Sequence, residues 1–140
     1  MNILLAVDGS EYTKRMLAYL AAHDELLAKG AQYTAITVVP SIPVHAANFL
    51  ERGVLDSYYR DEADKILAPI QAFAAQQGWE MKVVKEHGGA AEHIAAYAES
   101  HKSDLIIMGS HGHGYLAKAV MGSVASGVMA RSERPVLLVR

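Results

Sequence analysis

The chain has 140 residues, of which 51% are hydrophobic, so it is long and apolar enough for one domain with a substantial core. Thirteen Lys and Arg stand against fifteen Asp and Glu, and this balance gives no reason to expect a nucleic acid or a membrane surface as a partner. The absence of cysteine excludes disulfides, thiol catalysis and thiolate metal sites. The apolar N-terminal stretch is too short for a signal peptide or a membrane span, and we expect a cytoplasmic protein.

The first thirty residues predict a buried strand followed by a helix. Residues 2–7 are mostly apolar and stop at Asp8, which indicates a strand that ends in a turn. Ser10 or Thr13 would cap the helix, and Gly30 would end it. Its apolar stripe would consist of Met16, Leu17, Leu20 and Leu27.

A second strand is predicted over residues 32–39. This stretch is rich in β-branched side chains, and Pro40 ends it because proline cannot donate a hydrogen bond to a strand ladder. Residues 41–47 contain another proline and are predicted to form a loop.

Helical spacing returns in the middle of the chain. It predicts a helix over residues 56–77, with Pro69 ending or kinking it, while residues 51–55 are either mobile or a short first turn. Residues 79–86 begin with alternating apolar and polar side chains, which is typical of a half-exposed strand at a sheet edge. A glycine pair turns the chain into a further helix, whose apolar face is formed by Ala91, Ile94, Ala95 and Ala98.

The last forty residues contain the clearest local signals. The run at residues 105–108 lies between Asp104 and Gly109 and predicts a strand that is buried on both faces. A glycine-rich loop, a helix over residues 124–132 and a final strand over residues 135–139 follow. Strands and helices thus alternate along the whole chain, which predicts an α/β fold with a parallel sheet and helices on both of its faces.

The glycine-rich loop has the chemistry of an anion site. Gly109 and Gly112 would let the backbone approach a ligand closely. Ser123 is a good cap for the helix that follows, and the first-turn N–H groups of Ser123, Val124 and Ala125 would carry the positive end of its dipole. Such an arrangement most often binds phosphate. The alternative is a tight connection from strand to helix that binds nothing.

The glycine spacing fits neither the P-loop nor the dinucleotide fingerprint. The pattern G-x2-G-x9-G-S, filled by Gly109, Gly112, Gly122 and Ser123, resembles the nucleotide-binding signature of the universal stress protein family. The stretches ILLAVDGSE, VVP, LIIMGSHG and RPVLLVR resemble that family as well, so the likeness covers essentially the whole chain. It implies a single domain over residues 1–140 with an open five-stranded parallel sheet in the order 3-2-1-4-5, which is the Rossmann-like fold of the adenine nucleotide alpha hydrolases.

The resemblance also implies a ligand, ATP with Mg²⁺, at the carboxyl ends of the strands. In the family, the residue matching Asp8 contacts the adenosine half and the backbone matching Val39 meets adenine; the alternatives are that Asp8 caps its own turn and that Val39 packs in the core. Many relatives carry Arg or Lys at the position of His113, so this chain departs there, and His113 or Lys118 would have to offset the phosphate charge. The candidate binding residues are Ala6, Val7, Asp8, Val39, Met108, Gly109, Ser110, His111, Gly112, His113, Gly122, Ser123, Val124 and Ala125.

Catalysis and metal binding have weak support in the sequence. There is no G-x-S-x-G elbow and no carboxylate pair at a readable spacing, so we expect at most a slow ATPase to which Asp8 and Lys118 contribute. His111 and His113 lack a third metal ligand, and they are expected to be solvated loop side chains.

We therefore expect a stress-response or signalling module that works by binding ATP and by presenting a surface to an unknown protein partner. An adaptor that binds no nucleotide is the alternative, and a slow hydrolase is another. The final strand, Val136–Val139, is short and apolar, and its place at a sheet edge predicts a homodimer through antiparallel contact of this strand.

Overall fold

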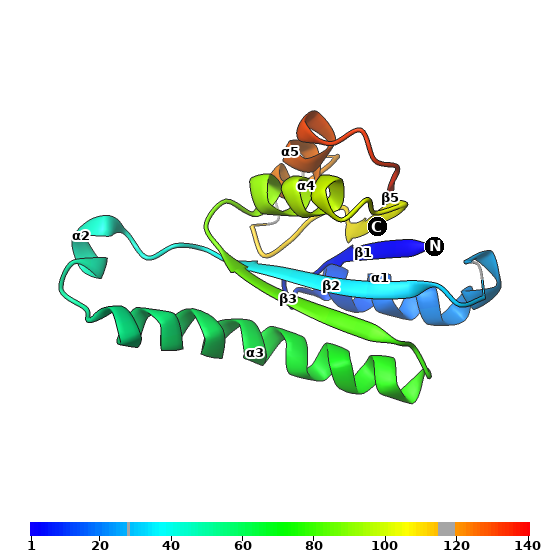
Figure 1. Ribbon diagram of the computed structural model, residues 1–140. Helices are drawn as coiled ribbons and strands as arrows, with labels where there is room; N and C mark the ends of the chain where they lie inside the picture. Colours follow the sequence, from blue (N-terminus) through cyan, green and yellow to red (C-terminus); the bar gives the residue numbers. More distant parts are fainter. Residues whose placement is uncertain (28, 115–119) are drawn as a thin grey trace.

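The computed structural model describes residues 1–27, 29–114 and 120–140 (Figure 1). The strands are β1 (Asn2–Ala6), β2 (Gln32–Val39), β3 (Met81–His87), β4 (Leu105–Gly109) and β5 (Val136–Val139). The helices are α1 (Glu11–Ala22), α2 (Val44–Ala47), α3 (Arg52–Gln76), α4 (Ala90–Ser100) and α5 (Ser123–Arg131), with a 3₁₀ turn at Asp24–Leu26. None of the helices in these ranges is both long and apolar enough to cross a membrane.

The strands form one parallel sheet in the order β3-β2-β1-β4-β5, which confirms the predicted order. β1 lies at the centre, where Leu5 is in register with Ala35 of β2 on one side and Ile107 of β4 on the other. The chain first builds outward from β1 to β3 and then crosses back to β4. The strand order therefore reverses between β1 and β4, and the carboxyl ends of these two strands form the place where α/β sheets bind ligands.

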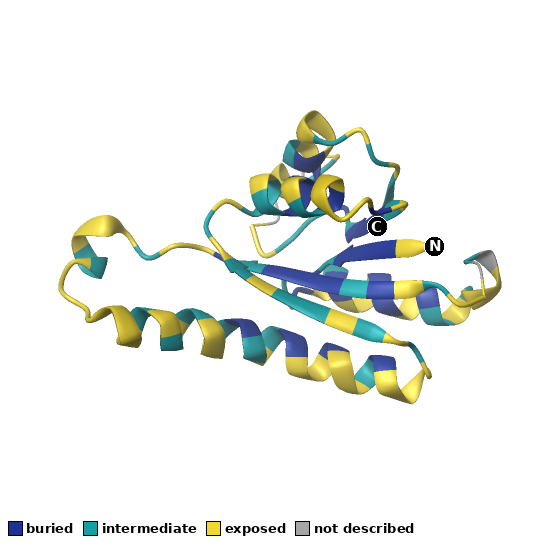
Figure 2. Cartoon of the chain, in the orientation of Figure 1, coloured by how far each residue is buried: buried dark blue, intermediate teal, exposed yellow. Residues whose placement is uncertain are grey.

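Helices cover both faces of the sheet because the central strands are apolar on both sides (Figure 2). On one face, Ile3 and Leu5 of β1 pack with α1 and α3. On the other face, Leu4 of β1 and Ile106 of β4 pack with α4 and α5. Successive residues of β1 thus belong to different cores, as the alternation of side chains along a strand requires.

The first helix is shorter than predicted. α1 ends at Ala22, not at Gly30, because the backbone of His23 leaves the helical region and its N–H donates to the carbonyl of Leu20 at 3.3 Å. Leu27 still packs against the same core from beyond the end of the helix, which explains why the apolar spacing looks continuous. Ser10 stands at the N-cap position, but its hydroxyl makes no capping hydrogen bond.

The helical segment in the middle of the chain is longer than predicted. Residues 44–47 form the short helix α2 where a loop was expected, and the carbonyl of Pro43 accepts its first hydrogen bonds. α3 starts at Arg52 and continues through Pro69. An interior proline costs a helix about 3 kcal/mol, but Leu67 and Ile70, on either side of Pro69, are buried against the sheet and hold the helix in place. α2 and the first turns of α3 project beyond the sheet (Figure 1).

Candidate functional site

A cavity of about 140 Å³ opens at the carboxyl ends of the central strands, where the strand order reverses. Five segments form it: the end of β1 with the following turn, the first turn of α1, the C-terminal half of β2, the start of α4, and the loop from the end of β4 into the start of α5. The lining residues are Ala6, Val7, Asp8, Thr13, Ile36, Val38, Ala90, Ile94, Met108, Gly109, His111, Gly112, His113, Gly114, Gly122, Ser123, Val124 and Ala125. Every candidate residue from the sequence is among them except Val39 and Ser110.

Asp8 closes the turn that follows β1. Its Oδ1 accepts the backbone N–H of Ser10 at 2.9 Å and the hydroxyl of Thr13 at 3.0 Å, while its own N–H donates to Thr13 Oγ1 at 3.1 Å. The alternative role, in which Asp8 caps its own turn, is therefore present in the structure. The second carboxylate oxygen, Oδ2, lies against Gly112, where a Cβ atom would collide with it.

The glycine-rich loop folds tightly against its surroundings. A Cβ atom at Gly109 would lie 2.6 Å from Cβ of Tyr12, and one at Gly122 would lie 3.1 Å from both Cα of His111 and the carbonyl oxygen of Ser110. The N–H of Gly122 donates to that same carbonyl at 2.6 Å. A side chain at Gly109 would therefore displace Tyr12, and one at Gly122 would press on the backbone of residues 110–111.

The helix α5 begins one residue earlier than predicted, so Ser123 is not its cap. Gly122 holds the N-cap position with an extended backbone (φ −69°, ψ 163°), and its carbonyl accepts the N–H of Ser126 at 3.0 Å. Ser123 is instead the first helical residue, and it is exposed and lines the cavity. The hydroxyl and the first-turn N–H groups, which have no partners within a helix, therefore lie together at the cavity wall.

Both histidines of the loop have partners; His113 is exposed, as expected of a solvated loop side chain, whereas His111 is half-buried. Nε2 of His113 lies 2.7 Å from the carbonyl oxygen of Asp8, and Nδ1 of His111 lies 2.9 Å from Oγ of Ser110. The ring of His111 also packs 5.1 Å from that of Tyr12. Within the described residues, no group of three or more His, Asp or Glu side chains could hold a metal ion.

Apolar side chains of β2 and α4 line part of the cavity as an apolar slot, and the sequence prediction missed most of it. Its walls include Ile36 and Val38 of β2 and Ile94 of α4. Val39 faces the opposite side of the sheet and is buried in the core beneath α1 and α3, while its carbonyl accepts the N–H of Gly88 at 2.9 Å. The alternation of side chains along β2 is the signal that could have identified Val38. The other lining residues that were missed are Thr13, Ala90 and Gly114.

The charge of the cavity is low. Asp8 is the one formally charged residue among the described residues that line it, and Ser110, although part of the loop, is buried with 2% of its surface exposed. Lys118, a candidate for offsetting phosphate charge, lies outside the described residues. In the described part of the site, the donors for an anion are therefore backbone N–H groups, the Ser123 hydroxyl and histidine.

These features define a class of protein. A doubly wound parallel sheet with a glycine loop and a helix N-terminus at its switch point is typical of α/β proteins that bind a phosphorylated ligand there. The family model of the universal stress protein family matches residues 1–140. The chain belongs to this family.

The chain is similar to known members along nearly its whole length. It is 33% identical over 140 residues to a universal stress protein of Thermus aquaticus, covering 99% of this chain and 98% of the relative. The structure of protein MJ0577 of Methanocaldococcus jannaschii superposes with a TM-score of 0.83 at 28% identity, covering 99% of this chain and 94% of the other. An Arabidopsis thaliana family member, determined with AMP bound, shares the fold with a TM-score of 0.70 at 15% identity, covering 99% and 90% of the two chains.

Proposed function

We propose that this protein binds an adenine nucleotide, ATP, in the cavity at the switch point and works as a stress-response or signalling module. The observation that carries the proposal is the meeting of a helix N-terminus, a backbone-packed glycine loop and an apolar slot around one cavity. Phosphate suits the first two, and a purine base suits the third. The AMP bound to the Arabidopsis relative is a ligand of the same chemical class.

Different described residues bind the phosphates, the adenine and the ribose of the nucleotide. The phosphates take the N–H groups of the first turn of α5 and the hydroxyl of Ser123, and His113 adds a donor when its ring turns from the Asp8 carbonyl. Adenine lies in the slot beside Ile36, Val38 and Ile94. Asp8, which also lines the cavity, takes either a ribose hydroxyl or the Mg²⁺ that accompanies ATP.

The site also fits the Mg²⁺ that accompanies ATP. Mg²⁺ is usually held by one or two carboxylates together with substrate phosphates and water. Asp8 is the carboxylate that the cavity offers, with Oδ1 engaged in its turn and Oδ2 beside Gly112. The metal would neutralise phosphate charge in a site whose described lining contains neither Lys nor Arg.

The protein acts by binding rather than by turnover. Nucleotide in the cavity thereby changes the surface around Gly112 and Gly122, and a protein partner in the cytoplasm recognises this surface. Hydrolysis is at most slow, because the described lining offers one carboxylate and no Arg for stabilising a transferring phosphoryl group.

Competition between nucleotides tests the adenine specificity. A fluorescent ATP analogue should be displaced by ATP and AMP, whereas GTP should be at least about tenfold weaker, because the extra polar groups of guanine would be left unpaired in the apolar slot. Fluorescence anisotropy measures the displacement. Equal displacement by GTP would contradict the assignment of the slot to adenine.

We also propose that the protein is a homodimer through β5, which is the edge strand next to β4. The carbonyls of Pro135 and Val139 accept hydrogen bonds from the N–H groups of Ile106 and Ser110, both at 2.9 Å. Backbone groups alternate in direction along a strand, so those of Leu138 point away from the sheet. A second copy of β5 can pair with this row of groups.

The dimer predicts different results for two substitutions at one position. Leu138→Pro removes an outward N–H without removing a bond to β4, and it should give a monomer at micromolar concentration. Leu138→Ala also removes most of the leucine side chain but keeps the backbone N–H, and this variant should remain a dimer. Size-exclusion chromatography with light scattering reads both states. A native protein that is monomeric under these conditions, or a Pro variant that remains dimeric, would rule out pairing through β5.

A further inference from the structure

A second and larger hollow lies on the opposite face of the sheet, between α1 and α3. Its volume is about 580 Å³, compared with about 140 Å³ for the cavity at the switch point. Asp8, Thr13 and His113 belong to both linings, so this groove begins at the wall of the first cavity and runs away from it between the two helices.

The groove exists because the two helices cover different strands. α1 contacts β4 and β5, whereas α3 contacts β2 and β3, and a channel remains between them. Its walls are apolar along their length: Leu17 and Ala18 come from α1, and Ile66, Pro69, Ile70 and Phe73 come from α3. Leu17 and Ile70 are buried in the core, and Ile66 and Phe73 pack against it, so the walls are parts of a fixed core.

The rim of the groove carries one lysine–glutamate ion pair on each side. Lys14 of α1 bonds to Glu11 at 2.9 Å, and Lys65 of α3 bonds to Glu62 at 2.9 Å. An ammonium group has three donors, so each of these pairs leaves donors for a further acceptor. The hydrogen bond that Lys65 donates to Glu62 raises the pKa of Lys65, which keeps this side chain cationic.

The acidic groups of the lining have partners of their own. Glu62 accepts from Lys65, and Oδ1 of Asp8 accepts from Ser10 and Thr13. The channel is therefore apolar along its walls and has ammonium donors to spare on each side, which suits a long apolar molecule with a strong acceptor, such as a carboxylate, at one end.

We propose that the groove between α1 and α3 binds a long-chain carboxylate of the fatty-acid type, with the alkyl chain along Leu17, Ile66 and Phe73 and the carboxylate at Lys14 and Lys65. The alkyl chain replaces water along a wall that offers it few hydrogen bonds. The carboxylate accepts the remaining ammonium donors. This site does not depend on nucleotide binding at the switch point.

Dodecanoate, below its micelle concentration, is the ligand for the test. Titrating the full chain should give saturable binding in calorimetry and shift the methyl resonances of Leu17, Ile66 and Ile70 in NMR spectra. Dodecanol, which has the same chain and no charge, should bind more weakly. Non-saturable uptake, or methyl shifts outside the groove, would overturn the proposal.

Two pairs of variants test where the alkyl chain and the carboxylate of dodecanoate bind. Ala18→Phe fills the groove from an exposed position and should weaken dodecanoate binding about tenfold or more. Ala72→Phe adds the same side chain at an exposed position of α3 outside the groove and should leave binding unchanged. Circular dichroism verifies that both variants fold.

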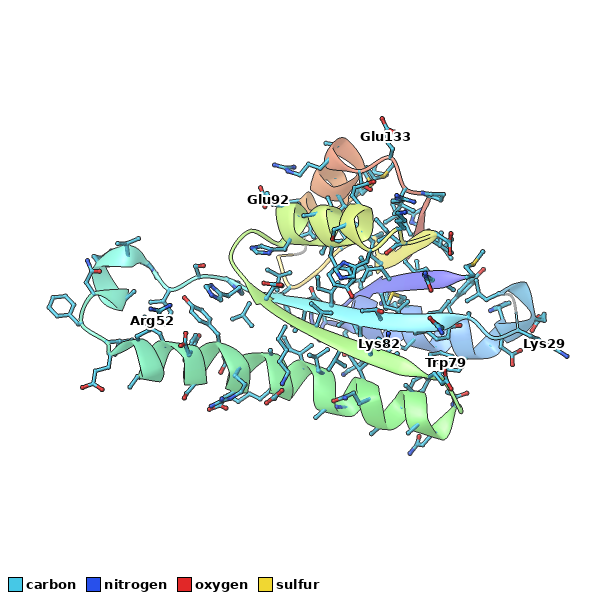
Figure 3. The ribbon with its side chains drawn as sticks, in the orientation of Figure 1. Lys29, Arg52, Trp79, Lys82, Glu92 and Glu133 are labelled. Atoms are coloured by element: carbon cyan, nitrogen blue, oxygen red, sulfur yellow. The ribbon has the colours of Figure 1, made fainter. Side chains whose placement is uncertain are left out.

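The charge variants are tested in the same way. Lys14→Gln with Lys65→Gln should weaken dodecanoate about threefold to fivefold and dodecanol hardly at all, because solvated ion pairs contribute little each. Lys29→Gln is the control, since Lys29 lies near the far end of α1 and outside the groove (Figure 3). Binding that survives both Ala18→Phe and the double lysine variant would exclude this site.

Discussion

Gly122→Val should weaken nucleotide binding by about a hundredfold or more. The backbone of Gly122 lies against Ser110 and His111, and even a single added carbon would sit 3.1 Å from atoms of both. Valine adds two further methyl groups, so the loop must move away from the start of α5. The movement separates the glycine loop from the first-turn N–H groups of the helix, which the phosphates need together. Calorimetric titration with ATP and Mg²⁺ measures the loss.

Gly114→Val is the matched control for this prediction. Gly114 lines the same cavity, but among the described residues, its chain neighbours aside, no atom lies within 4 Å of the position that its Cβ would take. The same side chain added there should leave most of the affinity. Equal affinities of the Gly122 variant and the native protein, with both folded, would show that the packing of this loop does not shape the site.

Ile107→Ala should lower the free energy of unfolding by about 2–5 kcal/mol. Ile107 belongs to the central strand β4 and is fully buried in the core beneath α1 and α3. Its partner in register is Leu5 of β1, which is also fully buried, so the truncated side chain leaves a cavity that neighbouring strands cannot fill. Urea unfolding monitored by circular dichroism measures the change.

Val44→Ala tests whether this cost comes from burial. Val44 lies in α2 and exposes 75% of its surface, so its truncation should change the free energy of unfolding by less than about 0.5 kcal/mol. A loss at Ile107 as small as the loss at Val44 would mean that the centre of the sheet is not packed as described.

The strands could be predicted because residues that disfavour strand structure stand at their ends. Pro40 ends β2, and the run at residues 105–108 stands between Asp104 and Gly109, so both strands lie where the apolar pattern places them. Helix ends were harder to predict. Leu27 continues the apolar spacing of α1 although the helix has ended, and α3 passes through Pro69 because packing on both sides offsets the lost hydrogen bond.

The candidate site, too, could be predicted only in part from the sequence. Glycine spacing identified the loop, since contacts between backbone segments leave a direct mark on the sequence. The apolar slot left a weaker mark, because Val38 and Val39 are chemically alike and only the strand direction decides which of them lines the cavity. The groove between α1 and α3 could not be predicted from the sequence, because its apolar wall residues have the same spacing as ordinary core residues of each helix.

The family and the fold do not by themselves choose between a nucleotide-binding module, an adaptor without nucleotide and a slow hydrolase. The cavity favours the first, because its glycines and helix N-terminus provide donors that an adaptor would not need. Metal-dependent ATP turnover that is lost in Asp8→Ala, with binding retained, would favour the hydrolase instead.

Calorimetric titration of the purified, nucleotide-stripped protein with ATP and Mg²⁺ tests the central claim most directly. We predict saturable binding of one nucleotide per chain, with AMP competing for the same site. A flat titration of the folded native protein would contradict the account. It would leave the glycine pattern as a means of packing the loop and make the adaptor the better description.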